Sequence, residues 1–209
     1  MNEMTFIFDF DGTIADTVEL MKEIAYKLVK EYNFPPLSER DITKLRNSKS
    51  EEIIRFFKVP LFKVPFFINR FRAEFGLASK NIEPVSGIAV VLETLKKSGH
   101  KLGIVTSNSD ENVHAFLAKY DLNFFDFIQT CSSLFGKAGK LRKIIKSYAL
   151  DKGSIIYVGD ETRDIDAARK SDIKVASATW GYNAKGILQS LQPDYLLDHP
   201  DELLTIASL

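Results

Sequence analysis

Two aspartates stand two positions apart directly after an apolar run near the start of the chain. The run FIF at residues 6–8 is followed by Asp9, Phe10 and Asp11, and Gly12 allows the chain to turn. Neighbouring carboxylates repel each other when both are ionised, and they add nothing to a hydrophobic core. They can, however, hold a hard cation such as Mg²⁺, or divide the roles of base and acid between them. The pair therefore predicts a chemical site.

Polar side chains follow two later apolar runs in the same way. These runs are GIV at residues 103–105 and IIYV at residues 155–158. In open parallel sheets, ligands bind outside the carboxyl ends of the strands, so the residues after all three runs are expected on one rim. Carboxylates gathered there would be charged at neutral pH, and Mg²⁺ relieves their repulsion while keeping open positions for a phosphate. The predicted rim residues are Asp9, Asp11, Thr106, Ser107, Asn108, Asp160, Glu161 and Asp164.

The elements that must position these residues predict an α/β fold. Short apolar runs alternate with segments of helical period, as in a Rossmann-like parallel sheet core flanked by helices. The expected helices include residues 88–98, which end at Gly99, and residues 110–119, which follow Ser109. The expected strands are residues 5–8, 101–105, 127–130, 154–158 and 174–178.

Between residues 17 and 83 the alternation stops and only helical patterns remain. We expect a small all-helical cap at residues 17–83, inserted after the first strand into a core made of residues 1–16 and 84–209. Ser48 and Glu51 have the spacing of a capping box for a helix inside this insert.

The insert also holds a short repeat, FKVP at residues 57–60 and again at 62–65. Its prolines predict short helical pieces. The surrounding phenylalanines can form the cap's own core or a patch for a membrane or partner, and the first interpretation is favoured.

The composition limits the classes of function. The chain has 209 residues, 45% hydrophobic and 27% charged, and its 28 basic and 28 acidic residues give a net charge of zero. This balance argues against a nucleic-acid partner. Cys131 is the only cysteine, and the three histidines (His100, His114 and His199) are too scattered for a zinc site. With no signal peptide or membrane span in evidence, we expect a cytoplasmic protein, as a monomer or homodimer.

Four stretches of this sequence together resemble the ordered motifs of the haloacid dehalogenase-like hydrolase superfamily. They are DFDGTIADT, IVTSNS, a lysine in FGKAGK, and VGDETRDIDAA, and the resemblance extends over the whole chain, cap included. The stretch ATWGY is similar to the phosphoglycolate phosphatase-like branch. The resemblance implies a Mg²⁺-dependent phosphatase that acts on a small phosphorylated metabolite through an aspartyl-phosphate.

The resemblance also implies roles for individual residues. Asp9 would be the nucleophile and a metal ligand. Asp11 would be the acid and then the base, giving the metal only its backbone carbonyl. Thr106 would bind a phosphoryl oxygen, Asp160 would bind the metal directly, and Asp164 would support the metal or orient the motif lysine.

Some assignments stay open at this point. The motif lysine is Lys137 or Lys140, with Lys137 in the better register. Glu161 departs from the Ser or Thr of many relatives, and it either tightens the metal site or faces solvent. The expected contacts to the substrate are Gly12, Thr13, Ser107 and Asn108, with Arg46 of the cap reaching a substrate carboxylate.

Other activities fit the same motifs less well. A phosphomutase of the β-phosphoglucomutase type would carry them all and differ in its cap. A non-catalytic binding or regulatory protein of this fold would usually lack the nucleophile or its partner acid, and both are present here. A dehalogenase has no use for the acid at Asp11, because a halide leaves without a proton.

Overall fold

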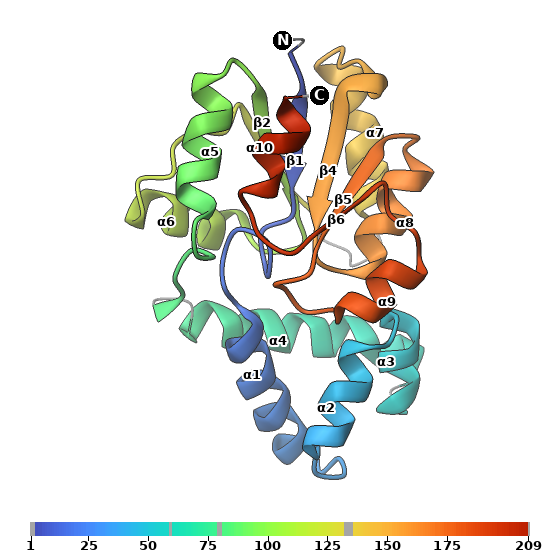
Figure 1. Ribbon diagram of the computed structural model, residues 1–209. Coiled ribbons are helices and arrows are strands. Elements are labelled where there is room, and N and C mark those ends of the chain that lie inside the picture. Colours follow the sequence, from blue (N-terminus) through green and yellow to red (C-terminus); the bar gives the residue numbers. More distant parts are fainter. Residues whose placement is uncertain (1–2, 59, 79–80, 132–135, 209) are drawn as a thin grey trace.

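The computed structural model describes residues 3–58, 60–78, 81–131 and 136–208. Within these ranges, one sheet of six parallel strands in the order β3-β2-β1-β4-β5-β6 carries helices on both faces, and further helices lie beyond one end of it (Figure 1). The predicted α/β core is therefore confirmed. The strands are β1 (Thr5–Phe8), β2 (Lys101–Thr106), β3 (Phe127–Thr130), β4 (Ile155–Gly159), β5 (Lys174–Ala178) and β6 (Tyr195–Leu197).

The position of β1 decides where a site can form. Phe8 pairs with Ile104 of β2 on one side and with Val158 of β4 on the other. The strand order reverses between β1 and β4, and in open α/β sheets a crevice forms outside the carboxyl ends at this point. The residues after β1, β2 and β4 therefore meet there. The five predicted strands agree with the observed ones to within a residue, whereas the short edge strand β6 was not predicted.

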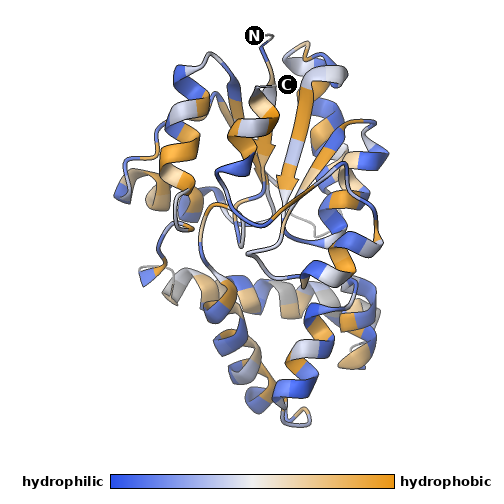
Figure 2. Ribbon diagram, in the orientation of Figure 1, coloured by the Kyte–Doolittle hydropathy of each residue, from blue (hydrophilic) through white to orange (hydrophobic). Residues whose placement is uncertain are grey.

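Helices cover both faces of this sheet, and the hydropathy colouring in Figure 2 shows their apolar sides turned toward it. On one face lie α5, α6 and α10, and on the other α7, α8 and α9. Their bounds are α5 (Ile88–Lys97), α6 (Asp110–Lys119), α7 (Lys137–Ser147), α8 (Thr162–Lys170), α9 (Lys185–Ser190) and α10 (Glu202–Ala207).

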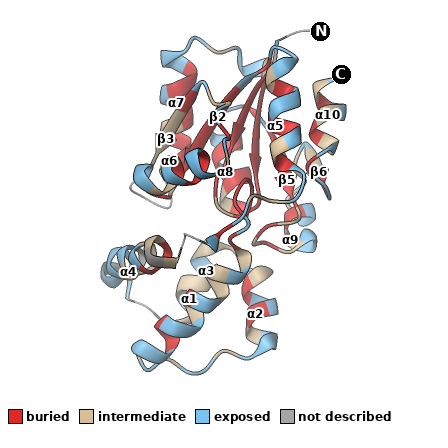
Figure 3. Cartoon of the chain, turned by 90° about the vertical axis from the view of Figure 1, so that its left-hand side faces the viewer, coloured by how far each residue is buried: buried red, intermediate tan, exposed pale blue. Residues whose placement is uncertain are grey.

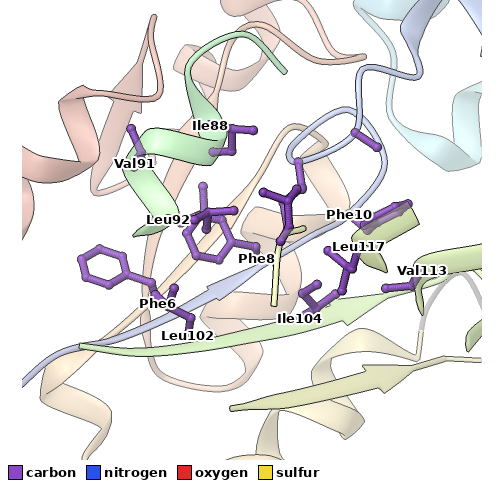
Figure 4. Close-up of a cluster of buried hydrophobic side chains, with 14 of the residues drawn as sticks. Phe6, Phe8, Phe10, Ile88, Val91, Leu92, Leu102, Ile104, Val113 and Leu117 are labelled. Atoms are coloured by element: carbon purple, nitrogen blue, oxygen red, sulfur yellow. The ribbon is translucent and has the colours of Figure 1, made fainter. Parts of the chain in front are cut away.

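The side chains of β1 alternate between these two layers, as the pleat of a strand requires. Phe6 and Phe8 pack against the first layer, where Figure 4 shows them beside Leu92 of α5. Ile7 points the other way and packs with Leu141 of α7. The whole strand is buried (Figure 3), which is why its sequence is continuously apolar. A strand held this firmly is a rigid base for the residues that follow it.

The insert between β1 and α5 forms the helical layer beyond the carboxyl ends of the strands (Figures 1 and 3). The segment that leads from the core into the insert and the segment that returns from it run next to each other. Ala15 forms an antiparallel bridge with Pro84, and the Asp16 N–H donates to the Glu83 carbonyl at 2.9 Å. The elements of the insert are α1 (Val18–Glu31), α2 (Glu39–Arg46), α3 (Ser50–Phe56), the 3₁₀ helix η1 (Leu61–Lys63) and α4 (Val64–Ala78).

The predicted capping box at Ser48 and Glu51 is wrong by one residue. Lys49 is the N-cap of α3, and its backbone N–H donates to the Glu52 carboxylate at 2.8 Å. The Ser48 hydroxyl instead donates to the Lys44 carbonyl at 2.9 Å, at the end of α2. Ser48 caps the C-terminal end of α2 instead of the start of α3, because the carbonyls in the last turn of a helix also need hydrogen-bond donors.

The prediction that the prolines of the repeat give only short helical pieces is wrong for its second copy. Pro65 lies in the first turn of α4, where a helix needs no N–H, so the second copy starts a helix of 15 residues. The phenylalanines divide between two environments: Phe75 is buried, whereas Phe62 and Phe66 are 81% and 56% exposed. Along the described ranges, no helix is both long and apolar enough to cross a membrane.

Candidate active site

The turn after β1 fixes Asp9 at the centre of the rim. Its backbone N–H still bonds to the Val158 carbonyl of β4 at 2.8 Å, and its carboxylate accepts the Phe10 N–H at 2.8 Å. Gly12 adopts a φ of 72°, and its N–H donates to the Ala15 carbonyl at 2.9 Å. The Gly12 N–H is thus used to close the turn. Asp9 itself is only 1% exposed.

Lys137 lies against Asp9. Its Nζ is 2.5 Å from Asp9 Oδ2 and 2.5 Å from Asp164 Oδ1, and all three side chains are buried. Burial acts to lower the pKa of Lys137, but the carboxylates of Asp164 and Asp9 outweigh it and raise that pKa above its usual range. The ammonium is therefore charged and can neutralise anions at this point. Lys140 is only half-buried and lies one helical turn further on.

Three buried carboxylates form a group that fits a hard cation. Asp9, Asp160 and Asp164 each offer an oxygen, and these oxygens lie within 4.8 Å of one another. Asp160 is held by two donors, the Thr13 hydroxyl at 2.9 Å and the Tyr182 N–H at 2.7 Å. Burial and the neighbouring carboxylates raise the pKa of Asp160 well above its usual range. An all-oxygen donor set whose charges repel in this way suits Mg²⁺.

Glycines provide the space that these carboxylates occupy. A Cβ on Gly12 would lie 2.3 Å from an Asp160 oxygen, and a Cβ on Gly181 would lie 2.2 Å from the Asp160 Cβ. At Gly159 a Cβ would lie 2.5 Å from an Asp164 oxygen. Side chains at these positions would displace the acidic group. The backbone therefore approaches both aspartates as closely as it can.

Asp11 faces the space between the core and the helical insert. The Asn108 side-chain amide donates to both of its oxygens, at 3.0 and 3.2 Å. Burial, followed by the charge of Asp9, raises the pKa of Asp11 to about 7. This carboxyl can therefore hold a proton near neutral pH, as a general acid must. Asn112 donates to the Asn108 oxygen at 3.0 Å and fixes the amide, a role that the sequence did not indicate.

The loop after β2 lies on the same rim. The Thr106 hydroxyl is fully buried and accepts the Asn108 N–H at 3.1 Å. The Ser107 hydroxyl accepts a bond from Arg163 at 3.4 Å, and its carbonyl accepts one from Arg72 of α4 at 2.9 Å. Both loop hydroxyls thus have protein partners, and Arg72 links the insert to the core at this point.

Glu161 lies at the start of α8, next to the three clustered aspartates but not among them. Its carboxylate pairs with the Arg163 guanidinium, and the residue is 9% exposed. Its backbone N–H donates to Asp164 Oδ2 at 2.9 Å, which holds that aspartate from the side opposite Lys137. Arg163 is a site residue that sequence reasoning missed, because a charged residue in a helix is more often at the surface.

Arg46 ties the helical insert to the core. Its guanidinium donates to the carbonyls of Tyr182 at 2.8 Å and Gly181 at 3.0 Å. In return, the Asn183 amide donates to the carbonyls of Arg46 at 2.9 Å and Ser48 at 3.2 Å. We call this set of bonds the clasp. The Arg46 guanidinium, which was expected to contact a substrate, thus holds the loop that carries Gly181. The sequence did not indicate the buried Asn183 as a residue of this clasp.

A cavity of about 340 Å³ lies between the insert and the rim. Its core end is lined by Asp11, Ser107, Asn108, Glu161, Arg163 and Tyr182, and Arg46 of the insert lies next to Tyr182. The rest of the lining comes from α1, α2, α3 and α4 and from Phe34 and Phe57 between them. The carboxyl of Asp11 therefore faces a partly open space of a size common for ligand sites.

Comparison with known proteins agrees with this geometry. A model of the haloacid dehalogenase-like hydrolase family matches residues 6–178, and the chain belongs to that family. The chain is 32% identical over 199 residues to phosphoglycolate phosphatase of Synechococcus elongatus, covering 95% of this chain and 94% of that protein. It is 26% identical over 210 residues to pyrophosphatase PpaX of Bacillus mycoides, covering 98% and 96%.

The fold is also shared with solved structures. The crystal structure of a predicted phosphatase from Clostridium acetobutylicum has a TM-score of 0.83 over the full length of both chains, at 21% sequence identity. At this identity the likeness shows the fold alone.

Thr13 was expected to contact the substrate, and its hydroxyl in fact donates to Asp160. We expect Thr13→Val to weaken Mg²⁺ binding by about 10- to 100-fold, because a partner that orients a metal ligand is lost at almost constant volume. Titration calorimetry with Mg²⁺ measures this directly. Thr94→Val on the exposed side of α5 is the matched control. Equal Mg²⁺ affinity in both variants would show that Thr13 does not orient Asp160.

Proposed function

We propose that this protein is a Mg²⁺-dependent phosphomonoester hydrolase that works through an aspartyl-phosphate on Asp9. The observation that carries the proposal is the buried Asp9 beside Lys137 and two further aspartates, with Asp11 facing a cavity. In this proposal Asp9, Asp160 and Asp164 hold the metal, together with the Asp11 carbonyl. The phosphatase name of the 32% identical relative supports the same reaction class.

The first half of the reaction forms a bond and breaks one. A carboxylate oxygen of Asp9 attacks phosphorus, and the bond from phosphorus to the alcohol oxygen breaks. The leaving oxygen takes the proton from Asp11, whose raised pKa keeps that proton available near neutral pH. Mg²⁺, when bound, offsets the charge of the phosphoryl oxygens and polarises phosphorus.

The second half returns the enzyme to its starting state. Asp11, now ionised, takes a proton from water, and the water oxygen attacks the phosphorus of the aspartyl-phosphate. Asp9 leaves as a carboxylate and inorganic phosphate is released. Throughout, the Lys137 ammonium offsets negative charge on Asp9. Thr106, Ser107, Asn108 and the turn at Gly12 are the proposed contacts for phosphoryl oxygens.

Residues 17–83 act in this proposal as a cap over the site. The clasp and the Arg72 bond support that role, because they hold the helices against the rim in a closed arrangement. Closure excludes water and strengthens the electrostatic interactions inside. The cap then decides which small phosphorylated metabolite reaches Asp9.

A panel of phosphorylated metabolites tests the reaction class, with phosphoglycolate included because a relative is named for it. We expect release of inorganic phosphate in Mg²⁺ and none in chelator. Transfer of the phosphate between two positions of a sugar, without its release, would show that the protein is a mutase and not a hydrolase. Absence of both reactions, in protein shown to be folded, would overturn the proposal.

A further inference from the structure

The walls of the cavity are largely apolar. Its volume of about 340 Å³ is roughly twice that of a cavity that holds benzene, which is about 150 Å³. Most of the lining side chains are aliphatic or aromatic and come from the inner faces of the four cap helices. Among them are Met21 and Leu28 of α1, Ile53 and Ile54 of α3, and Phe71 and Phe75 of α4.

The cationic side chains on these walls are already engaged. They are Lys22, Arg46, Arg72 and Arg163, and each one bonds to a carboxylate or a carbonyl of the protein. Arg163 and Glu161 form a largely buried pair, and an anionic group that took the place of Glu161 would leave that carboxylate buried and unpaired. A small dianionic acid would leave most of the apolar lining of this space without a contact. The partners are Glu19 for Lys22, Glu161 for Arg163, and backbone carbonyls of the core for Arg46 and Arg72.

The cavity is continuous with the proposed active site. Asp11 and Asn108 belong to both, because they line the cavity while the amide holds the carboxyl. A phosphate at Asp9 would therefore leave its ester oxygen near Asp11 and direct the alcohol portion into the cap. That portion would meet apolar side chains over most of its surface.

From this arrangement we infer that the substrate is the phosphomonoester of an apolar alcohol, with an alkyl chain or ring that fills the cavity inside the cap. The inference rests on the proposed function for the position of the phosphate. Apolar groups gain from leaving water in proportion to their area, so the cavity selects for the size of the alcohol.

Binding of alkylphosphonates tests the inference apart from the reaction, because their carbon–phosphorus bond is not hydrolysed. We expect the Kd in Mg²⁺ to fall about fourfold for each added methylene from methyl to hexyl. Titration calorimetry gives the values. A Kd that does not change with chain length would overturn the inference.

A filling variant connects this trend to the cavity. Ala25 of α1 lines the cavity, and Ala25→Phe is expected to reduce the ratio of methyl to hexyl Kd at least tenfold by occupying the space. Ala73→Phe on the exposed side of α4 is the matched control and should keep the wild-type ratio. An unchanged ratio in Ala25→Phe, with the wild-type trend present, would place the apolar site elsewhere and overturn the inference.

Hydrolysis of the matching alkyl phosphates separates the two proposals. Hexyl phosphate should exceed both methyl phosphate and phosphoglycolate in kcat/KM. Chain-dependent binding without hydrolysis would overturn the proposed reaction and support the apolar ligand site. Efficient hydrolysis of phosphoglycolate, with a flat alkyl series, would support the reaction and overturn the inference about the substrate.

Discussion

Asp9→Asn is expected to lose phosphatase activity by about 10⁴-fold or more, because an amide cannot form the aspartyl-phosphate. The variant should still fold, since Lys137 keeps its second carboxylate partner at Asp164. Phosphate release from the best substrate measures the loss. Mass spectrometry of acid-quenched enzyme should detect a phosphorylated peptide containing Asp9 in the wild type only.

Asp16→Asn is the matched control for this variant. Asp16 lies in the same loop, but its side chain is exposed and outside the acidic group. It should retain activity close to that of the wild type. If Asp9→Asn turned over any substrate at a rate within about tenfold of the wild type, Asp9 would not be the nucleophile.

Lys137→Met is expected to lower the free energy of unfolding by about 3–5 kcal/mol in the absence of Mg²⁺. The substitution leaves Asp9 and Asp164 buried without the ammonium that bonds to both. The loss should shrink as the pH falls, because burial raises the pKa of Asp164 and its protonation removes an unpaired buried charge. Mg²⁺ should restore part of the stability. Urea denaturation at several pH values, with Mg²⁺ and with chelator, measures these effects.

Lys143→Met provides the comparison on the same helix. Lys143 is exposed on α7, and its replacement should change the unfolding free energy by less than about 0.5 kcal/mol. If Lys137→Met unfolds at the same urea concentration as this control in chelator, the buried lysine does not compensate the two aspartates.

The sequence predicted the family and the core of the fold because both depend on local patterns. Buried parallel strands give continuous apolar runs, and the residues after them meet at one rim by the topology of the sheet. This topology predicted that Asp9 and Asp160 lie together, whereas Lys137 was expected only from the resemblance to the family, with Lys140 as the alternative. Their roles in catalysis remain proposals.

The parts that escaped prediction depend on contacts across the chain. The sequence predicted a substrate contact for Arg46 and did not indicate that its guanidinium bonds to carbonyls more than a hundred residues away in sequence. Arg163 and Glu161 pair within one turn, but only the burial of that turn makes the pair part of the site. The cavity arises from how the four cap helices pack together over the rim, which their separate periodicities do not specify.

The central place of β1 also shapes how the chain must fold. Thr5 pairs with Lys101 on one side and with Ile155 on the other, so β1 is synthesised well before either strand that it pairs with. The helices of residues 18–78 can form in the meantime from nearby contacts. Pairing between strands that are distant in sequence slows folding, because the entropy cost of closing the intervening loop comes before the stabilising contacts form. The apolar strand that anchors Asp9 therefore stays without its sheet partners until β2 and β4 have been synthesised.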